Sequence, residues 1–433
     1  MATTGRSSTN TVPGAHAGAR MDVRALTPDV GLKEYWYPAI EASKVGRKPV
    51  GMKICGEQLV FFKGKEKGEV SALANICPHR GGSLMHGDCH YPGTVSCPYH
   101  GWTFDGEGNV LAVLPEGPDS QVPGKIVHRS YPTQTLRGMV FVWMGKDEPA
   151  PIEEDVPPEF FTNEGQILYA WEVWPVNWRP AVENAGDAHV PYVHRDAAVI
   201  LMDPVTQAGP YRGGTVMIND RAVKSAQPTP GANGAAVAGL SPGSTMGLPY
   251  RWDFPELGKW PKHRWRSAWA WAFRWAVKRR RAGTTIDDSD EWGVGVGTMH
   301  HLPAMVRVDY KTHMYTRVNV PIDEYNTRQI YWHYTDHDNW FAKFREKLLF
   351  HVWHRWALYS NFSIQDFRAV GPQLYDEPEY LSSSDSRLIM WRRLLTRARG
   401  LDPVVRKTAT TAAEEASIAM QHEMGKVPDD WTD

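Results

Sequence analysis

Four residues in two short motifs have the types and the spacing of metal ligands. Cys77 and His79 form a Cys-x-His motif, and Cys97 and His100 form a Cys-x-x-His motif. Together they offer two thiolates and two imidazoles. Glycine follows each motif closely, so the backbone can fold tightly around a compact bound group. The pattern indicates a metal centre held by equal numbers of sulfur and nitrogen ligands.

This ligand set favours a Rieske [2Fe–2S] cluster over a structural zinc site. In a Rieske cluster, two cysteines hold one iron and two histidines hold the other. Zinc sites usually place two cysteines in one motif and two histidines in another, whereas each motif here contains one of each. We therefore expect all four residues to bind a [2Fe–2S] cluster. The residues expected to surround it are Arg80, Tyr99 and Trp102, although ordinary loop packing explains Tyr99 and Trp102 equally well.

A second pair of histidines, His189 and His194, lies in a segment that also contains Asn, Asp and Glu. Non-heme Fe(II) oxygenases bind iron through two histidines and one carboxylate, which leaves positions open for O2. Two histidines at this spacing are, on their own, more often packing or surface residues. The Rieske motif upstream reverses that balance, because an electron carrier alone would leave most of the chain without a role. We therefore predict a mononuclear Fe(II) site.

Composition excludes several classes of protein. The chain has 433 residues and a formal net charge of −1, so no overall field directs it to nucleic acid or to a membrane. No apolar run is long enough for a transmembrane helix. Only four cysteines occur, and Cys55 and Cys89 are expected to be inert packing thiols. So few cysteines fit a reducing, cytoplasmic location.

The sequence predicts an α+β protein with two domains. Residues 1–31 are expected to form a disordered tail without the apolar region of a secretory signal. Residues 32–150 are expected to form a small all-β Rieske domain. Residues 151–433 are expected to form an α+β catalytic domain with an antiparallel, helix-grip-like sheet and a Gly/Pro-rich loop at 227–249.

Periodic patterns give the expected elements. Alternating hydrophobic residues favour an antiparallel sheet with one buried face, and the strands are expected at 58–62, 69–73, 138–144, 305–310, 314–320 and 328–334. Helical spacing runs over 340–359, and 363–370 is expected to continue as a second helix. The Trp- and Arg-rich stretch 260–281 fits either an interfacial or ferredoxin-binding helix, or a substrate-channel wall or subunit contact.

The chain resembles the Rieske non-heme iron aromatic-ring-hydroxylating oxygenases, most closely terminal oxygenase components of the carbazole 1,9a-dioxygenase type. Segment 177–196 is similar to the iron-binding segment of that family, and the likeness extends over about residues 34–395. The resemblance implies that an aspartate on a downstream helix is the third iron ligand. Asp366 is the best match, and Asp376 and Asp385 are weaker alternatives.

One interval departs from the pattern of the family. The family generally has Asp-x-x-His, but only one residue separates Asp187 from His189. Residues two apart on a regular helix point about 200° apart, so they cannot share a face. Either the helix is irregular here, through Pro191 or a π-bulge, or Asp187 does not have the bridging role of the family.

The resemblance implies a terminal oxygenase that uses O2 to hydroxylate an apolar, aromatic or polycyclic substrate, by monooxygenation or dioxygenation. Electrons from NAD(P)H would arrive through a separate reductase and, in some systems, a ferredoxin. A homotrimer is implied, in which His100 would hydrogen-bond Asp187 of the neighbouring subunit and Asp187 would orient His189. Asn184 is a further candidate catalytic residue. The alternative is a Rieske electron-transfer or binding protein whose second domain is inactive.

Overall fold

The computed structural model describes residues 24, 27–186, 189, 193, 194, 197, 214–226, 253–254, 258–259, 292, 298–309, 313–382 and 385–401. Several features discussed above lie outside these residues. They are most of the predicted tail, Asp187, the loop 227–249 and the stretch 260–281.

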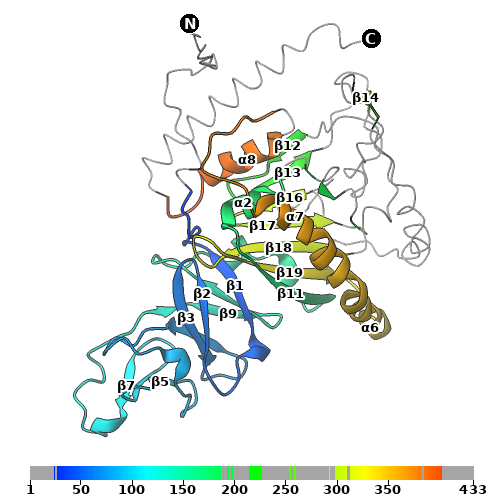
Figure 1. The fold of residues 1–433 in the computed structure, drawn as a ribbon. Helices are drawn as coiled ribbons and strands as arrows, with labels where there is room; N and C mark the ends of the chain where they lie inside the picture. The colour runs from blue at the N-terminus through cyan, green and yellow to red at the C-terminus, as the bar shows by residue number, and fades with distance from the viewer. Residues whose placement is uncertain are drawn as a thin grey trace, which may run out of the picture.

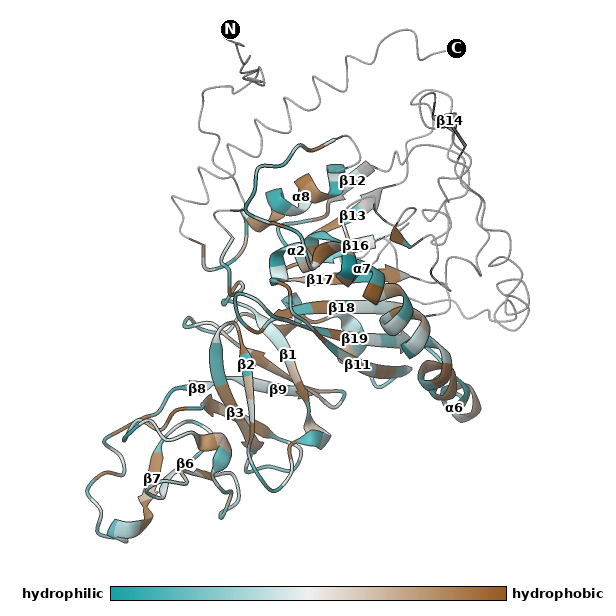
Figure 2. Ribbon diagram, viewed as in Figure 1, coloured by the Kyte–Doolittle hydropathy of each residue, from teal (hydrophilic) through white to brown (hydrophobic). Residues whose placement is uncertain are grey.

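Three small antiparallel sheets form the first part of the chain, in the orders β1-β10-β9, β2-β3-β4-β8 and β5-β6-β7. Their strands are β1 (Trp36–Glu41), β2 (Val50–Ile54), β3 (Glu57–Lys63), β4 (Val70–Ala74), β5 (Val95–Ser96), β6 (Trp102–Phe104), β7 (Val110–Val113), β8 (Ser130–Tyr131), β9 (Thr133–Leu136) and β10 (Met139–Trp143). Hydrophobic residues fill the middle of β3 (Figure 2). The all-β first domain is therefore confirmed.

A seven-stranded antiparallel sheet forms the second part, in the order β11-β19-β18-β17-β16-β13-β12. Its strands are β11 (Gln166–Trp174), β12 (Gly214–Met217), β13 (Ala222–Ala226), β16 (Thr298–His301), β17 (Met305–Asp309), β18 (Met314–Pro321) and β19 (Thr327–Thr335). The short strands β14 (Asp253–Phe254) and β15 (Gly258–Lys259) pair separately.

The helices of the second part are α2 (Trp178–Glu183), α6 (Trp340–Leu349), a π-helix (Phe350–Phe362), α7 (Ser363–Val370) and α8 (Ser386–Leu395). The expected α+β class is confirmed, and both predicted helical segments are present. Among the described residues, none of the helices combines the length and hydrophobicity needed to span a bilayer.

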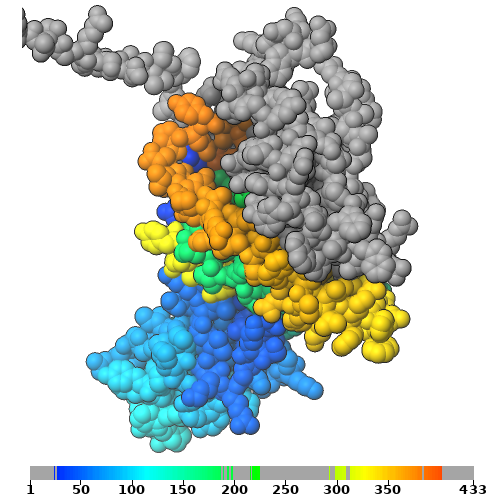
Figure 3. Space-filling model, turned by 45° about the vertical axis from the view of Figure 1, so that its right-hand side comes forward, coloured from blue at the N-terminus to red at the C-terminus, as the bar shows by residue number. Residues whose placement is uncertain are grey.

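The two parts lie end to end, with β5, β6 and β7 at the end farthest from α7 and α8 (Figures 1 and 3). They nevertheless share one hydrophobic core, which includes Phe141 from β10 and Trp332 from β19. The β2–β3 hairpin adds backbone contacts, because the N–H groups of Cys55 and Gly56 donate to the carbonyls of Pro321, the last residue of β18, and Ile322. The predicted boundary near residue 150 stays a prediction.

The central strands β18 and β19 are buried on both faces, so the expectation of a single buried face is wrong. One face packs on the first domain through apolar residues such as Val318 and Trp332. The other carries Tyr315, Arg317 and Tyr331 under the helical segment. Polar residues on this second face are therefore buried between sheet and helix instead of facing solvent.

The predicted helix at 340–359 changes type halfway along. It is α-helical to Leu349 and becomes a π-helix over 13 residues before α7 begins at Ser363. π-Helical geometry is rare and is found most often at functional sites. Because it widens the turn, it shifts which residues of the continuing helix face the sheet.

A buried ion pair fixes the second sheet to the loop that enters it. Arg307 of β17 and Glu159 have fully buried side chains, and Arg307 Nη1 lies 2.8 Å from Glu159 Oε1. The indole N–H of Trp332 also donates to Glu159, at 3.1 Å. Removing one member of such a pair leaves an uncompensated charge in the core.

We expect Glu159→Gln to lower the free energy of unfolding by about 3–5 kcal/mol, because Arg307 would lose its counter-charge in a dry site. Urea denaturation followed by circular dichroism measures the change. Asp323→Asn is the matched control, because it breaks the partly exposed Lys53–Asp323 pair. Its expected effect is below about 1 kcal/mol. Equal losses for the two variants would contradict the assigned importance of the buried pair.

Candidate metal centres

Two loops of the first domain have the same backbone design. In each loop, the cysteine N–H donates to the carbonyl five residues later, and its carbonyl accepts from the glycine four residues later. These four hydrogen bonds measure 2.7–3.1 Å. Gly81 and Gly101 occupy the glycine position with φ of 71° and 62°, a conformation that other residues rarely adopt. The loops therefore present Cys77 and Cys97, with the histidines that follow them, in equivalent ways.

The four predicted cluster ligands come together at the tips of these loops. Cys77 and Cys97 are buried, whereas His79 is exposed and His100 is half-buried. The two imidazole rings lie 4.6 Å apart, centroid to centroid. A methyl group on Gly82 would lie 3.0 Å from Cys97 Sγ, so glycine is needed at this position for space beside the sulfur.

The donor set fits a Rieske cluster. Burial and, after it, the adjacent Cys97 raise the pKa of the Cys77 thiol to about 11. A bound metal ion would stabilise the thiolate form of this residue, which is otherwise protonated at neutral pH. Sulfur ligands on the inside and imidazoles toward the surface would leave the histidine-bound iron accessible for electron transfer.

All three predicted neighbours of the cluster contact these loops. The Trp102 ring stacks on His79, with 4.9 Å between centroids and 3° between planes. The Arg80 guanidinium lies 5.6 Å from the Tyr99 ring centroid. Tyr99 is 59% exposed, so it is a surface residue, whereas Trp102 forms part of the core of this domain.

In the second part of the chain, the structure brings His189, His194 and Asp366 together. Asp366 Oδ1 lies 3.0 Å from His189 Nε2 and 2.7 Å from His194 Nε2. Two ligands bound at right angles to one ion, each about 2.1 Å from it, would lie about 3.0 Å apart. The spacing of these donor atoms therefore fits a single metal ion with two histidines and one carboxylate.

Asp366 carries a buried charge that its neighbours stabilise. The residue is 3% exposed, and His194 is fully buried. Burial alone would raise the pKa of Asp366, but charge interaction with His194 and hydrogen bonds from both histidines outweigh it. The pKa of Asp366 is therefore held well below its usual range. A permanently ionised carboxylate suits a metal ligand.

The helix that carries Asp366 also positions His194. Gln365 Oε1 lies 3.1 Å from His194 Nδ1, so it can accept the Nδ1 proton and leave the Nε2 lone pair for a metal. The Phe362 ring, at the end of the π-helix, stacks on His194 with 3.5 Å between centroids. Partners of this kind fix the tautomer and the orientation of a ligand histidine.

Arg317 of β18 completes the surroundings of Asp366. Its Nη1 lies 3.9 Å from Asp366 Oδ2, and its Nη2 donates to the Ala181 carbonyl of α2 at 3.2 Å. The guanidinium also lies 5.5 Å from the Trp174 ring centroid. This buried cation links the sheet, α2 and α7 around the carboxylate.

A buried ion pair joins α2 to α8. Glu183, the last residue of α2, forms a two-pronged ion pair with Arg392 of α8, at 2.8 and 2.7 Å. The Tyr375 hydroxyl donates to the same carboxylate at 3.0 Å. This buried link holds the helix that leads into the His189–His194 segment.

The other candidates have different outcomes. Asn184 follows α2 and is buried, and its Nδ2 has no hydrogen-bond partner among the described residues. Its catalytic role stays a prediction, as does that of Asp187, which lies outside the described residues. Asp376 is exposed beside Arg179, and Asp385 accepts hydrogen bonds from Ser382 before α8. Neither alternative aspartate belongs to the His189–His194 group.

Sequence reasoning did not find Gln365, Phe362 or Arg317. Gln365 and Phe362 flank the predicted ligand on its own helix, so helical spacing from Asp366 was the available signal. The signal for Arg317 was weaker. It is a charged residue within a mostly hydrophobic strand.

Two family models match the chain. Residues 35–129 match the Rieske [2Fe–2S] domain, and residues 143–229 match the homotrimeric ring hydroxylase model. Both matched segments are therefore similar to Rieske ring hydroxylases. The predicted resemblance is confirmed. The [2Fe–2S] domain that contains the Cys77 and Cys97 loops is confirmed with it.

Individual proteins support the same family. The chain is 32% identical over 173 residues to the carbazole 1,9a-dioxygenase terminal oxygenase component CarAa of Metapseudomonas resinovorans, over 40% of this chain and 44% of that protein. It is also 32% identical to the tert-butanol monooxygenase/tert-amyl alcohol desaturase oxygenase subunit of Aquincola tertiaricarbonis, over 40% and 36% of the two chains. These alignments therefore span less than half of each relative.

The fold is also that of a solved Rieske ring hydroxylase. A structure of the reduced complex between oxygenase and ferredoxin in carbazole 1,9a-dioxygenase superposes with a TM-score of 0.62 at 22% identity. The superposition covers 86% of this chain and 91% of that chain. The likeness extends well beyond the region of sequence similarity.

We expect Cys97→Ala to abolish the visible absorbance and EPR signal of the cluster, because one iron would lose half of its protein thiolates. The matched control is Cys55→Ala, which removes a buried thiol at the tip of the β2–β3 hairpin. Its cluster absorbance should equal that of the unmodified chain. Retention of the Rieske signal by Cys97→Ala would contradict the ligand assignment.

Proposed function

We propose that this protein is a terminal oxygenase component that hydroxylates an apolar, aromatic or polycyclic substrate. Electrons enter through a cluster on Cys77, His79, Cys97 and His100. The mononuclear iron site consists of His189, His194 and Asp366. The observation that carries the proposal is the close approach of these three side chains in a chain that also has a Rieske domain. Bound there, Fe(II) would supply the activation of O2.

The residues around the triad would keep the site ready for metal. Gln365 holds the His194 proton on Nδ1, and the Phe362 ring covers one face of the same imidazole. Arg317 balances the buried negative charge of Asp366 from the sheet side. A facial set of three protein ligands leaves the other positions for O2 and water.

We further propose that electrons cross between subunits of a homotrimer. In one chain the cluster loops, which flank β5, lie at the far end of the first domain, well away from α7 in the second part (Figure 1). The exposed imidazole of His79 and the exposed Tyr99 point the cluster tip away from the core. A neighbouring subunit that covers this tip would bring a second iron site close to it. The matched model describes homotrimeric proteins, which agrees with this arrangement.

Asp187 is the proposed bridge between the two centres. It would accept a hydrogen bond from His100 of one subunit and orient His189 of its own chain. Because only one residue separates Asp187 from His189, the backbone there must depart from a regular helix for both contacts to form. The proposal rests on the family resemblance of this segment.

The electron donor is proposed to be a separate reductase, with or without a ferredoxin. The sequence has no Gly-rich nucleotide-binding motif and no plant-type ferredoxin motif. The similar solved structure is a complex with ferredoxin. All four cysteines are free, which supports a reducing, cytoplasmic location. The substrates named for the relatives make carbazole the first compound to test.

The alternative, an electron-transfer or binding protein with an inactive second domain, requires a different arrangement around Asp366. An inactive domain has no need to keep two histidines and a carboxylate within ligand distance in a buried site. The ligand-like geometry of the donor atoms therefore favours the oxygenase.

We expect Asp366→Ala to weaken Fe(II) binding at the mononuclear site by more than about 100-fold while the Rieske spectrum is unchanged. Gln365→Leu should weaken it by about 10–100-fold, as is usual when the partner of a ligand histidine is lost. Iron content after gel filtration measures both effects. Asp376→Ala is the matched control and should retain full iron. Full iron content and O2 uptake in Asp366→Ala would contradict the triad.

Mixed trimers test electron transfer between subunits. Cys97→Ala and Asp366→Ala chains, each with a different affinity tag, are coexpressed and purified through both tags. With carbazole present, air oxidation of the reduced cluster should be fast in these mixed trimers, because an intact cluster lies beside an intact iron site of the neighbouring subunit. Asp366→Ala trimers are the slow control. If mixed trimers are as slow as this control, electrons do not cross between subunits.

A further inference from the structure

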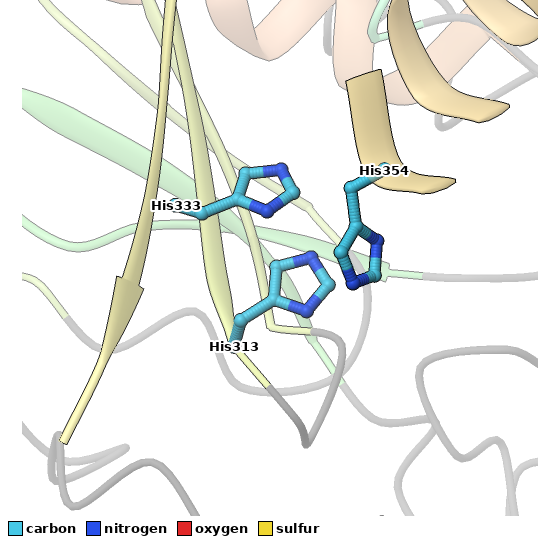
Figure 4. A group of neighbouring side chains, drawn as sticks. All are labelled: His313, His333 and His354. Atoms are coloured by element: carbon cyan, nitrogen blue, oxygen red, sulfur yellow. The ribbon is translucent and has the colours of Figure 1, made fainter. Parts of the chain in front are cut away.

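A second group of metal-binding side chains lies on the helix-facing side of the sheet, apart from the triad. It consists of His313, His333 and His354, which share no residue with the His189–His194–Asp366 group. One nitrogen from each imidazole lies within 4.8 Å of the others. Figure 4 shows the three rings turned toward one another.

Three different elements supply these histidines. His313 immediately precedes β18, and His333 lies in β19 opposite Tyr315. His354 lies in the π-helix. The group therefore joins both central strands of the sheet to the helix that covers them.

The rings are buried and packed against one another. The His313 and His333 rings are stacked 4.2 Å apart, and His354 lies 4.9 Å from His313 and 5.2 Å from His333, centroid to centroid. The most exposed of the three, His354, is only 9% exposed. The rings of Phe350 and Tyr359 enclose the group from the π-helix side.

Three buried imidazoles this close together cannot all be positively charged, because like charges repel strongly in a site of this kind. Neutral imidazole is also the form that binds transition metals. In a tetrahedral site with Zn–N bonds of about 2.0 Å, ligand nitrogens lie about 3.3 Å apart. The observed nitrogens lie within 4.8 Å of one another, so metal binding requires them to approach one another by at most about 1.5 Å.

We propose that His313, His333 and His354 bind one divalent transition metal ion, with Zn²⁺ as the best match. Three neutral nitrogen ligands without a carboxylate suit this borderline ion and leave one position for water. The ion would cross-link the π-helix to β18 and β19. Because α7 continues directly from the π-helix, this cross-link would also fix the position of the helix that carries Asp366.

Zinc binding by an Asp366→Ala chain isolates this site from the triad. This chain is first treated with a mild chelator and then dialysed against one equivalent of Zn²⁺ per chain. It should retain about one zinc per chain, as expected for a three-histidine site. Adding His354→Gln should lower the affinity more than tenfold. Adding His351→Gln is the matched control, since His351 is an exposed histidine on the same π-helix, and it should change nothing.

Zinc K-edge X-ray absorption identifies the ligands of the bound ion. The proposed site gives nitrogen neighbours at about 2.0 Å, whereas zinc trapped by the cluster cysteines would show sulfur at about 2.3 Å. If His354→Gln disrupts folding, shown by loss of the Rieske spectrum, His313→Gln is the second variant, and it should lower affinity equally. Zinc bound through sulfur, zinc binding unaffected by a folded histidine variant, or no stoichiometric zinc would overturn the proposal.

Discussion

The buried charge of Asp366 is the constraint on which the second domain depends. A carboxylate that is 3% exposed must have positive or hydrogen-bonding partners close by. His189 and His194 approach it from one segment, and Arg317 approaches it from the sheet. These partners come from two parts of the chain that are distant from Asp366 in the sequence, so folding of this domain also assembles the candidate metal site.

The helical segment shows how that assembly is achieved. The chain leaves β19, forms α6, and then widens into a π-helix before α7 presents Asp366. The wider turn places His354 over the strands and Phe362 on the ring of His194. The ligands of the first domain are easier to assemble. Two adjacent loops with the same pattern of backbone hydrogen bonds supply all four cluster ligands. In the proposed homotrimer, the cluster of one subunit would supply electrons to the iron site of its neighbour.

The sequence was sufficient where function depends on local spacing. The Cys-x-His and Cys-x-x-His motifs predict the cluster loops, and alternating residues predict β3, β10, β18 and β19 closely. Asp366 could be selected only through family resemblance, because 172 residues separate it from His194 and nothing local links the two. The expectation of a single buried face failed on β18, because polar residues in an alternating strand usually face water, whereas Arg317 is buried beside Asp366 of α7. The three-histidine group also escaped notice, because its members come from three different elements and form no local motif.

The central claim is that one chain contains a Rieske cluster and a separate mononuclear iron site. Iron and acid-labile sulfide, measured per chain on anaerobically purified protein together with its EPR spectrum, test this claim most directly. The account predicts about three irons and two sulfides, with a Rieske-type signal. About two irons to two sulfides, unchanged after anaerobic incubation with Fe(II), would contradict it and leave the electron-carrier alternative.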